Sequence, residues 1–177
     1  MKTFSIMFKV ILIILVAGVC AGGCAGAKLE SSARIAVLTY NIYHGEDVKG
    51  GSNLDAVAGI INSLKPDLVA IQEVDNKTGR AKGLDLTAEL SRRTGMQGVF
   101  GKAMDYDGGG YGEAVLSRYP LLEIKNNPLP HDAKAEPRAA LEVHIELPGG
   151  VKMAFVGTHL DHQRDQSNRM MQAKRIV

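Results

Sequence analysis

The fold is decided by residues 35–73, which read IAVLTYNIYHGEDVKGGSNLDAVAGIINSLKPDLVAIQE. This stretch begins with residues 35–42, a β-branched and apolar run that predicts a strand and carries Asn41 near its end. It closes with residues 67–71, a continuous apolar run of the kind found in strands that are covered on both faces. The second run leads into Glu73, so each predicted strand delivers a polar side chain at its C-terminal end.

A helix is predicted between these two strands. Ser52 or Asn53 can cap its first turn, and Pro66 follows its end. One face of this helix is made by apolar residues at three- and four-residue spacing, namely Leu54, Val57, Ala58, Ile61 and Leu64. A strand, a helix and a strand form a βαβ unit, in which the strands are parallel and their C-terminal ends meet at one edge of a sheet. Asn41 and Glu73 are therefore expected to be neighbours at an edge where sites commonly form.

Short elements follow this unit. A second helix is expected over residues 84–94, with Leu86 and Leu90 facing inward. Residues 107–110, DGGG, are interpreted as a mobile loop, and residues 148–150, PGG, as a hairpin turn. Five further strands are predicted over residues 98–103, 113–117, 121–125, 139–146 and 152–158.

The last predicted helix covers residues 164–177. It places Met170, Ala173 and Val177 on one apolar stripe. No Gly, Asn or Pro follows this stripe, so we expect the chain to be the N-terminal part of a longer domain. A natural C-terminal helix that frays is the alternative.

The N-terminus has the pattern of an export signal. The apolar run over residues 10–19 follows Lys2 and Lys9, and it is shorter than the roughly 20 residues that a membrane span requires, which leaves a span as the less favoured alternative. The small residues at positions 21–23 resemble a bacterial lipoprotein cleavage site before Cys24. The protein is then expected to be exported and held by lipid on the bacterial cell envelope, on the periplasmic or the outer surface. The expected order is a lipoprotein signal peptide (1–23), a lipid-modified Cys24, a tether (24–33) and one domain (34–177).

The composition is that of a globular protein, with 45% apolar and 23% charged residues. Removing Lys2 and Lys9 with the signal leaves 19 of the 21 basic residues, which equals the 19 acidic residues. A neutral chain gives no support to tight non-specific nucleic-acid binding, because such binding depends on neutralising phosphates. Cleavage also removes Cys20, and lipid occupies Cys24, so no thiol remains for a disulfide.

Five short segments are informative when they are taken together and in order. They are TYNI (39–42), QEV (72–74), YGEAVLSRYP (111–120), PRAA (137–140) and GTHLD (157–161). In this order and spacing they resemble the endonuclease/exonuclease/phosphatase family, which includes deoxyribonucleases, abasic-site endonucleases, inositol phosphate phosphatases and sphingomyelinases. The resemblance runs from about Arg34 to the end of the chain. It implies an α+β fold, a four-layer αββα sandwich of the deoxyribonuclease-like type.

The resemblance also implies a metal-dependent phosphoesterase, and the residue types agree with this chemistry. Hydrolysis of an anionic phosphodiester is helped by a hard cation that binds phosphate oxygen and stabilises the leaving group. Glu73 is then the metal ligand. Mg²⁺ suits it because this ion needs few protein carboxylates, and Mn²⁺ is also possible. Asn41 assists at the metal or orients a water or the phosphate. The competing interpretations are a solvated carboxylate for Glu73 and a simple strand end for Asn41.

Three further residues receive roles from the same resemblance. His159 is expected to donate a proton or hydrogen bond to a phosphate oxygen, with a purely structural histidine as the alternative. Tyr111 resembles a family tyrosine that contacts the scissile phosphate. Arg138 is expected to clamp the phosphate, or else to pair with Glu136 or Glu142.

The remaining polar residues have weaker assignments. Ser117 and Arg118 are expected to hold a strand and a turn. Asp161 is a further ligand or orients His159, and Arg169 and Gln172 share a helix face that can point back at it. Four histidines are interpreted as ordinary polar residues: His44, His131, His144 and His162.

Two segments of the family pattern, Gly-Asp-x-Asn and Ser-Asp-His, do not occur in this sequence. In the family they position the attacking water and complete the acid–base set, and such catalysis typically contributes about 10²- to 10⁴-fold. We therefore expect little turnover by this chain alone. The chain is expected to supply one sheet of the sandwich and part of the second.

Three functions follow from these patterns. The first is a hydrolase that acts on a phosphate ester, either a nucleic acid, a nucleotide or a phospholipid head group. The second is a non-catalytic envelope lipoprotein that binds a phosphorylated ligand or a partner through a half-fold. The third is an envelope α/β lipoprotein in which the motifs arise by coincidence.

Overall fold

The computed structural model describes residues 11–15 and 34–177. The expected signal peptide, Cys24 and the tether lie outside these residues, apart from the short segment 11–15. The described elements in chain order are β1 (Ile11–Leu15), β2 (Ile35–Asn41), η1 (Tyr43–Gly45), α1 (Leu54–Leu64), β3 (Leu68–Asn76), α2 (Leu86–Thr94), β4 (Gln97–Tyr106), β5 (Gly109–Ser117), β6 (Leu121–Leu129), β7 (Arg138–Leu147), β8 (Val151–Thr158) and α3 (Ser167–Ile176).

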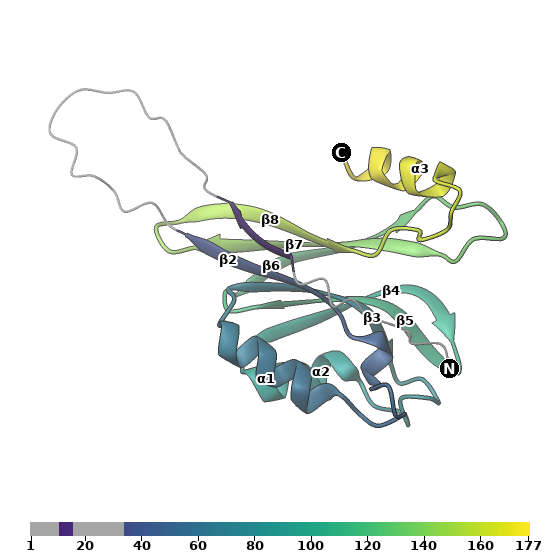
Figure 1. The fold of residues 1–177 in the computed structure, drawn as a ribbon. Helices are drawn as coiled ribbons and strands as arrows, with labels where there is room; N and C mark the ends of the chain where they lie inside the picture. Colours follow the sequence, from purple (N-terminus) through teal and green to yellow (C-terminus); the bar gives the residue numbers. More distant parts are fainter. Residues whose placement is uncertain (1–10, 16–33) are drawn as a thin grey trace, which may run out of the picture.

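The strands form two sheets, one above the other in Figure 1. The first sheet has the order β1-β2-β3-β5-β4, and the second has the order β6-β7-β8. Helices α1 and α2 cover the outer side of the first sheet, and α3 lies on the far side of the second (Figure 1). The arrangement of helices, sheet, sheet and helix confirms the predicted α+β sandwich.

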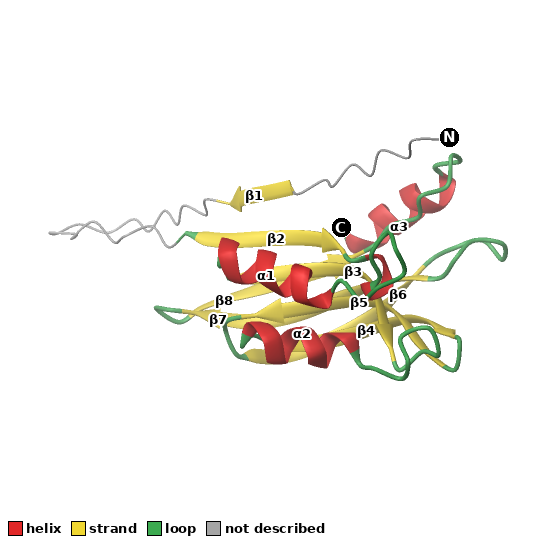
Figure 2. Cartoon of the chain, turned by 60° about the horizontal axis from the view of Figure 1, so that its bottom comes forward, coloured by secondary structure: helices red, strands yellow, loops and turns green. Residues whose placement is uncertain are grey.

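The βαβ unit is formed as predicted. Strands β2 and β3 are parallel neighbours, and Asn41 at the end of β2 is in register with Gln72 of β3. The short strand β1 runs antiparallel to β2 on its other side, at the edge of the sheet (Figure 2). The prediction that the two site-bearing strands lie side by side is therefore confirmed.

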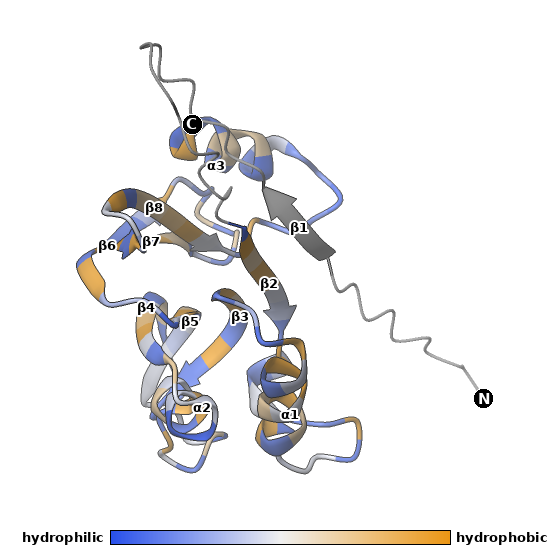
Figure 3. Cartoon of the chain, turned by 90° about the vertical axis from the view of Figure 1, so that its left-hand side faces the viewer, coloured by the Kyte–Doolittle hydropathy of each residue, from blue (hydrophilic) through white to orange (hydrophobic). Residues whose placement is uncertain are grey.

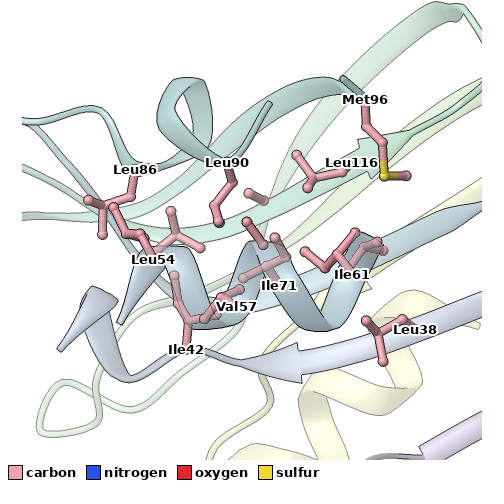
Figure 4. Packing of buried hydrophobic residues seen from close by; sticks show 14 residues of the cluster. Leu38, Ile42, Leu54, Val57, Ile61, Ile71, Leu86, Leu90, Met96 and Leu116 are labelled. Carbon is pink, nitrogen blue, oxygen red and sulfur yellow. The ribbon is translucent and has the colours of Figure 1, made fainter. Parts of the chain in front are cut away.

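One hydrophobic core joins the two helices to the first sheet (Figure 4). Ile61 of α1 and Leu90 of α2 are fully buried near Ile71 of β3. Burying a side chain of this size contributes about 1.5–3 kcal/mol. Hydrophobic and hydrophilic residues are both present along α1 and α2, as expected of helices with one face on a core (Figure 3). The two sheets are joined by separate apolar clusters that include Leu68, Val115, Leu141, Val143 and Ile145.

The start of α1 differs from the prediction. Asn53 occupies the cap position, but its side chain makes no capping hydrogen bond. Its Nδ2 donates instead to the backbone oxygens of Ile42 at 3.0 Å and Glu46 at 2.9 Å. The Ser52 hydroxyl accepts from the first helical N–H at 3.4 Å. Asn53 therefore holds the segment that directly follows Asn41.

The second helix begins at Leu86, two residues later than predicted, and ends at Thr94 as predicted. The Asp85 carboxylate accepts a hydrogen bond from the Ala88 N–H at 3.0 Å, which caps the first turn of α2. Gly95 ends the helix with a left-handed backbone, and Leu86 and Leu90 are buried.

The segment 107–110 is a tight hairpin, so the prediction of a mobile loop is wrong. Gly109 and Gly110 belong to β5, and only Asp107 and Gly108 form the turn, both with positive φ. A Cβ atom on Gly109 would lie 2.4 Å from the backbone oxygen of Asn76 in β3. The glycines therefore allow two strands to approach closely. The five later strands are all found, each longer than predicted, because backbone pairing continues past the apolar runs.

Helix α3 starts at Ser167 and packs differently from the prediction. Met170 and Val177 of the expected apolar stripe are exposed, whereas Asn168 and Gln172 are buried. These two polar side chains bond to backbone groups of neighbouring loops, which is why they take the inner face. Within the described part of the chain, no helix has the length and apolarity needed to cross a membrane.

Candidate active site

Glu73 lies in a β-bulge. Strand β3 pairs with β5 on both sides of this residue, but the register shifts between Ile71 and Val74, and the φ angle of Glu73 is +58°. A left-handed backbone at such a residue is uncommon, and it is found where the surrounding structure holds it, often at functional sites. The predicted strand end before Gln72 is wrong, because β5 pairs with β3 as far as Asn76. The bulge, and not a strand end, sets the direction of the Glu73 side chain.

Asn41 and Glu73 are in direct contact. The Nδ2 of Asn41 donates to Oε1 of Glu73 at 2.7 Å. Its Oδ1 accepts from the backbone N–H of Tyr43 at 2.9 Å, and this second bond orients the amide. The two residues predicted for a metal site thus form one pair, where the end of β2 meets the bulge of β3.

Arg138 is the first residue of β7, in the second sheet, and is only 3% exposed. Its Nη1 pairs with Oε1 of Glu136 at 2.7 Å, so Glu136 is the acidic partner and Glu142 is not. Nη1 and Nη2 each lie 3.3 Å from a histidine Nδ1, of His159 and His162 respectively. Among the described residues, the buried Nε of Arg138 has no hydrogen-bond partner. A donor without an acceptor is costly to bury, so this site favours an additional anionic or polar group.

His159 follows β8 and faces the guanidinium of Arg138. Burial lowers the pKa of His159 to about 4, and the charge of Arg138 acts in the same direction, while Glu73 opposes it. The ring is therefore neutral at pH 7. Because Arg138 donates toward Nδ1, the proton of the neutral ring belongs on Nε2. His159 can donate a hydrogen bond from Nε2, but it does not hold an acidic proton near neutral pH.

Tyr111 lies in β5, in register with Asp75 of β3, and is buried. Burial raises the pKa of its hydroxyl far above the usual value. The carboxylates of Glu73 and Glu136 raise this pKa further, and Arg138 opposes the shift. Because Tyr111 is opposite Asp75, two residues beyond Glu73 along β3, it lies in the same part of the first sheet as Glu73. The structure thus brings together all five residues singled out from the sequence, Asn41, Glu73, Tyr111, Arg138 and His159.

Glu113 is a site neighbour that the sequence analysis missed. It is 1% exposed in β5, between the two sheets, and burial raises the pKa of its carboxyl to about 8 even though Arg138 acts to lower it. Its Oε2 has no hydrogen-bond partner in the described part of the chain. Glu113 is therefore held largely as a neutral acid at pH 7. The available signal was a lone acidic residue inside an otherwise apolar strand.

His162 is a second missed residue, since it was interpreted as an ordinary polar side chain and yet lies against Arg138. Its spacing of three residues from His159 could have indicated that the two histidines act together. The Asp161 carboxylate accepts from the Gln163 N–H at 2.6 Å, and no hydrogen bond joins it to His159 within residues 34–177. Helix α3 does point back at Asp161, because Gln172 accepts from its N–H. Asp161 therefore stabilises the loop before α3.

Ser117 and Arg118 have the structural roles that were predicted. The Ser117 hydroxyl bonds to the backbone N–H and C=O of Tyr119, and Nε of Arg118 donates to the backbone oxygen of Pro66 at 2.8 Å. These contacts hold the end of β5 against the start of β3.

The donor set at Asn41 and Glu73 determines which metal the residues fit. No group of three or more His, Cys, Asp or Glu side chains suited to a metal is present in the described residues. One carboxylate beside one amide does not suit zinc, which is usually held by several nitrogen or sulfur ligands. It does suit a hard ion such as Mg²⁺, which keeps most of its waters and binds one or two carboxylates.

Two facing sheets with outer helices form an α+β sandwich, which carries a carboxylate–amide pair on the first sheet and a buried arginine with a histidine on the second. A family model described as the endonuclease/exonuclease/phosphatase family matches residues 38–173. The chain belongs to this family, whose members are generally phosphodiesterase-like or nuclease-like hydrolases. No curated protein matches the chain in sequence.

Solved structures show the same fold. An endonuclease/exonuclease/phosphatase from Beutenbergia cavernae DSM 12333 is 21% identical with a TM-score of 0.67, over 80% of this chain and 43% of its own. Humanized D. rerio TDP2 is 21% identical with a TM-score of 0.59, over 79% of this chain and 53% of its own. A family protein from Leptotrichia buccalis C-1013-b is 16% identical with a TM-score of 0.63, over 79% of this chain and 59% of its own. The chain therefore spans about half the length of these relatives.

Proposed function

We propose that this chain contributes the metal- and phosphate-binding part of a divalent-metal-dependent phosphate-ester hydrolase. The observation that carries the proposal is the 2.7 Å contact between Asn41 and Glu73, in a cluster with the buried guanidinium of Arg138. The pair suits a hard cation, and the guanidinium suits the anion that such a cation binds. Two groups with these opposite preferences, one from each sheet, suit a metal–phosphate complex.

Each residue has a definite part in this proposal. Glu73 holds Mg²⁺ or Mn²⁺, which would supply charge stabilisation to the phosphate and the leaving group. Asn41 orients the Glu73 carboxylate through its amide. The Nη atoms of Arg138, and its Nε, which has no partner among the described residues, would donate to phosphate oxygen, and neutral His159 would donate a hydrogen bond from Nε2. The Tyr111 hydroxyl stays protonated and donates to the phosphate.

The residues described above do not include a group that positions the attacking water. Because the Gly-Asp-x-Asn and Ser-Asp-His segments do not occur in the sequence, we expect metal and phosphate binding to be stronger features of this chain than turnover. The second candidate function is therefore a non-catalytic protein that binds a phosphorylated ligand. The same cluster serves both functions, and only turnover separates them.

The proposal includes the cellular setting expected from the sequence. We propose export, lipid attachment at Cys24 and a position on the cell envelope. The substrates available at the cell envelope include nucleotides, scavenged nucleic acid and phospholipid head groups. Labelling with a radioactive fatty acid tests this part, and Cys24→Ala should abolish the label.

The test of the site uses the full chain with Mn²⁺ and Mg²⁺. Titration with Mn²⁺, followed by electron paramagnetic resonance, should show one bound ion, and Glu73→Gln should weaken binding at least tenfold. Glu146→Gln, the same change at an exposed glutamate of β7, is the matched control and should bind normally. Hydrolysis of a diester and a monoester with Mg²⁺ then separates the enzyme from the binding protein. Equal Mn²⁺ affinity in the wild type and Glu73→Gln would refute the metal site.

A further inference from the structure

Beside the phosphate cluster lies a group of three neighbouring side chains, here called the Tyr106–Arg80 wall: Tyr106, Arg80 and Tyr111. The guanidinium carbon of Arg80 is 4.4 Å from the ring centre of Tyr106 and 5.4 Å from that of Tyr111. The two tyrosine ring centres are 6.1 Å apart. Tyr111 links the two groups, because it is in register with Asp75, two residues beyond Glu73 along β3. The wall therefore adjoins the proposed phosphate position.

Arg80 is held rigidly in this wall. Its Nε and Nη2 bond to the two carboxylate oxygens of Asp75 at 2.7 and 2.8 Å, and Asp75 is fully buried. The Thr78 hydroxyl donates to the same carboxylate at 2.6 Å. The Arg80 N–H donates to the Asp107 carboxylate at 2.6 Å, which ties the loop to the β4–β5 hairpin. A two-point ion pair with backbone support fixes the plane of the guanidinium.

The outer part of the wall is open to a ligand. Tyr106 is 39% exposed at the end of β4. Nη1 of Arg80 makes no hydrogen bond within the described residues, although Nε and Nη2 are both used. The wall thus offers an aromatic surface and a donor that has no partner among the described residues.

We propose that the Tyr106–Arg80 wall receives a nucleobase attached to the phosphate, so that the substrate class is a nucleotide or single-stranded nucleic acid. Flat aromatic and guanidinium surfaces stack on any base, and a free N–H can donate to the electronegative edge of the base. A choline head group fits poorly, because its cation needs an open aromatic face and here meets a guanidinium instead. This inference rests on the proposed phosphate site.

The test compares thymidine 5′-monophosphate with phosphocholine, using calorimetric titration of the full chain with Mg²⁺. We expect the nucleotide to bind about tenfold more tightly, the size expected of one stacked base. Tyr106→Leu, which keeps an apolar side chain without a ring face, should bring the two affinities together, and Tyr106→Phe should keep the difference. Leu122→Ala, an exposed change on β6 far from the Arg138 end of the sheet, is the control for general effects.

The outcomes separate this inference from the proposed function. If both ligands bind with equal affinity and Tyr106→Leu changes neither, the wall has no role in recognition and the inference fails, while the phosphate site stands. Tighter binding of phosphocholine overturns the inference in the same way. If neither ligand binds, or if Arg138→Gln leaves both affinities unchanged, the phosphate site itself is refuted and the wall with it.

Discussion

The amide of Asn41 donates to the carboxylate of Glu73 at 2.7 Å, across two adjacent parallel strands. Glu73 reaches this contact from a left-handed position in a β-bulge, while Asn41 stands at the end of its strand. The Asn41–Glu73 pair is thus formed by a regular strand, β2, and a strand with a bulge, β3. The functional predictions depend on this contact, on the buried residues Glu113 and Arg138, and on the half-buried His159.

Replacing Asn41 should weaken metal binding without unfolding the protein. Asn41→Ala removes the hydrogen bond that orients the Glu73 carboxylate, and loss of such a supporting group typically costs about 10- to 100-fold in metal affinity. Mn²⁺ titration monitored by electron paramagnetic resonance measures the change. Asn62→Ala, on the exposed side of α1, should leave the affinity unaltered. An Asn41→Ala protein with wild-type affinity would contradict the role given to the amide.

His159 should remain neutral well below its usual titration range. Its pKa is lowered to about 4 by burial and by Arg138, so the neutral form is the one favoured by folding. The stability that depends on this effect is present above pH 6.5, and it is lost as the pH falls toward 4. Chemical shifts of the imidazole followed by NMR between pH 4 and 8 check this directly. Arg138→Gln should raise the midpoint, and a wild-type midpoint near 6.5 would refute the assigned environment.

Glu113 should make the protein less stable as the pH rises. Its pKa is raised to about 8 in the folded state from 4.5 when exposed, so the folded protein holds a proton that the unfolded chain releases between these values. The free energy of unfolding should therefore fall from pH 5 to pH 8, by an amount on the order of a few kcal/mol. Urea unfolding at several pH values measures the slope. Glu113→Gln should flatten it, whereas exposed Glu146→Gln should not; an identical slope in wild type and Glu113→Gln would count against a neutral Glu113.

Two glycine-to-alanine changes should have opposite effects on stability. In Gly109→Ala the new Cβ would lie 2.4 Å from the Asn76 oxygen, so the β3–β5 contact must open, and we expect a loss of at least about 2 kcal/mol. In Gly59→Ala the Cβ meets no atom within 4 Å on the exposed side of α1, and helix propensity predicts a gain of about 0.5–1 kcal/mol. Denaturant midpoints compare both with the wild type. Equal stability of the two variants would show that residues 107–110 do tolerate rearrangement.

The sequence by itself determined one pairing of the first sheet, the parallel pair of β2 and β3. The apolar runs before Asn41 and Glu73, with an amphipathic helix between them, were sufficient to predict parallel neighbours, because local periodicity sets the elements and a short crossover sets their order. It also indicated the candidate site residues, through motifs that are contiguous along the chain. The strand lengths, the hairpin at residues 107–110 and the buried face of α3 were not predictable in this way, since each depends on pairing with a distant segment.

Only the tertiary structure decided how the site residues act on one another. The bulge at Glu73 arises from the register of β5, and the neutral states of His159 and Glu113 arise from burial between the two sheets. Arg138 pairs with Glu136, which precedes β7, whereas Glu142 further along the strand bonds to His144. Sequence patterns report local preference, whereas register, burial and electrostatic field exist only after distant segments pack together.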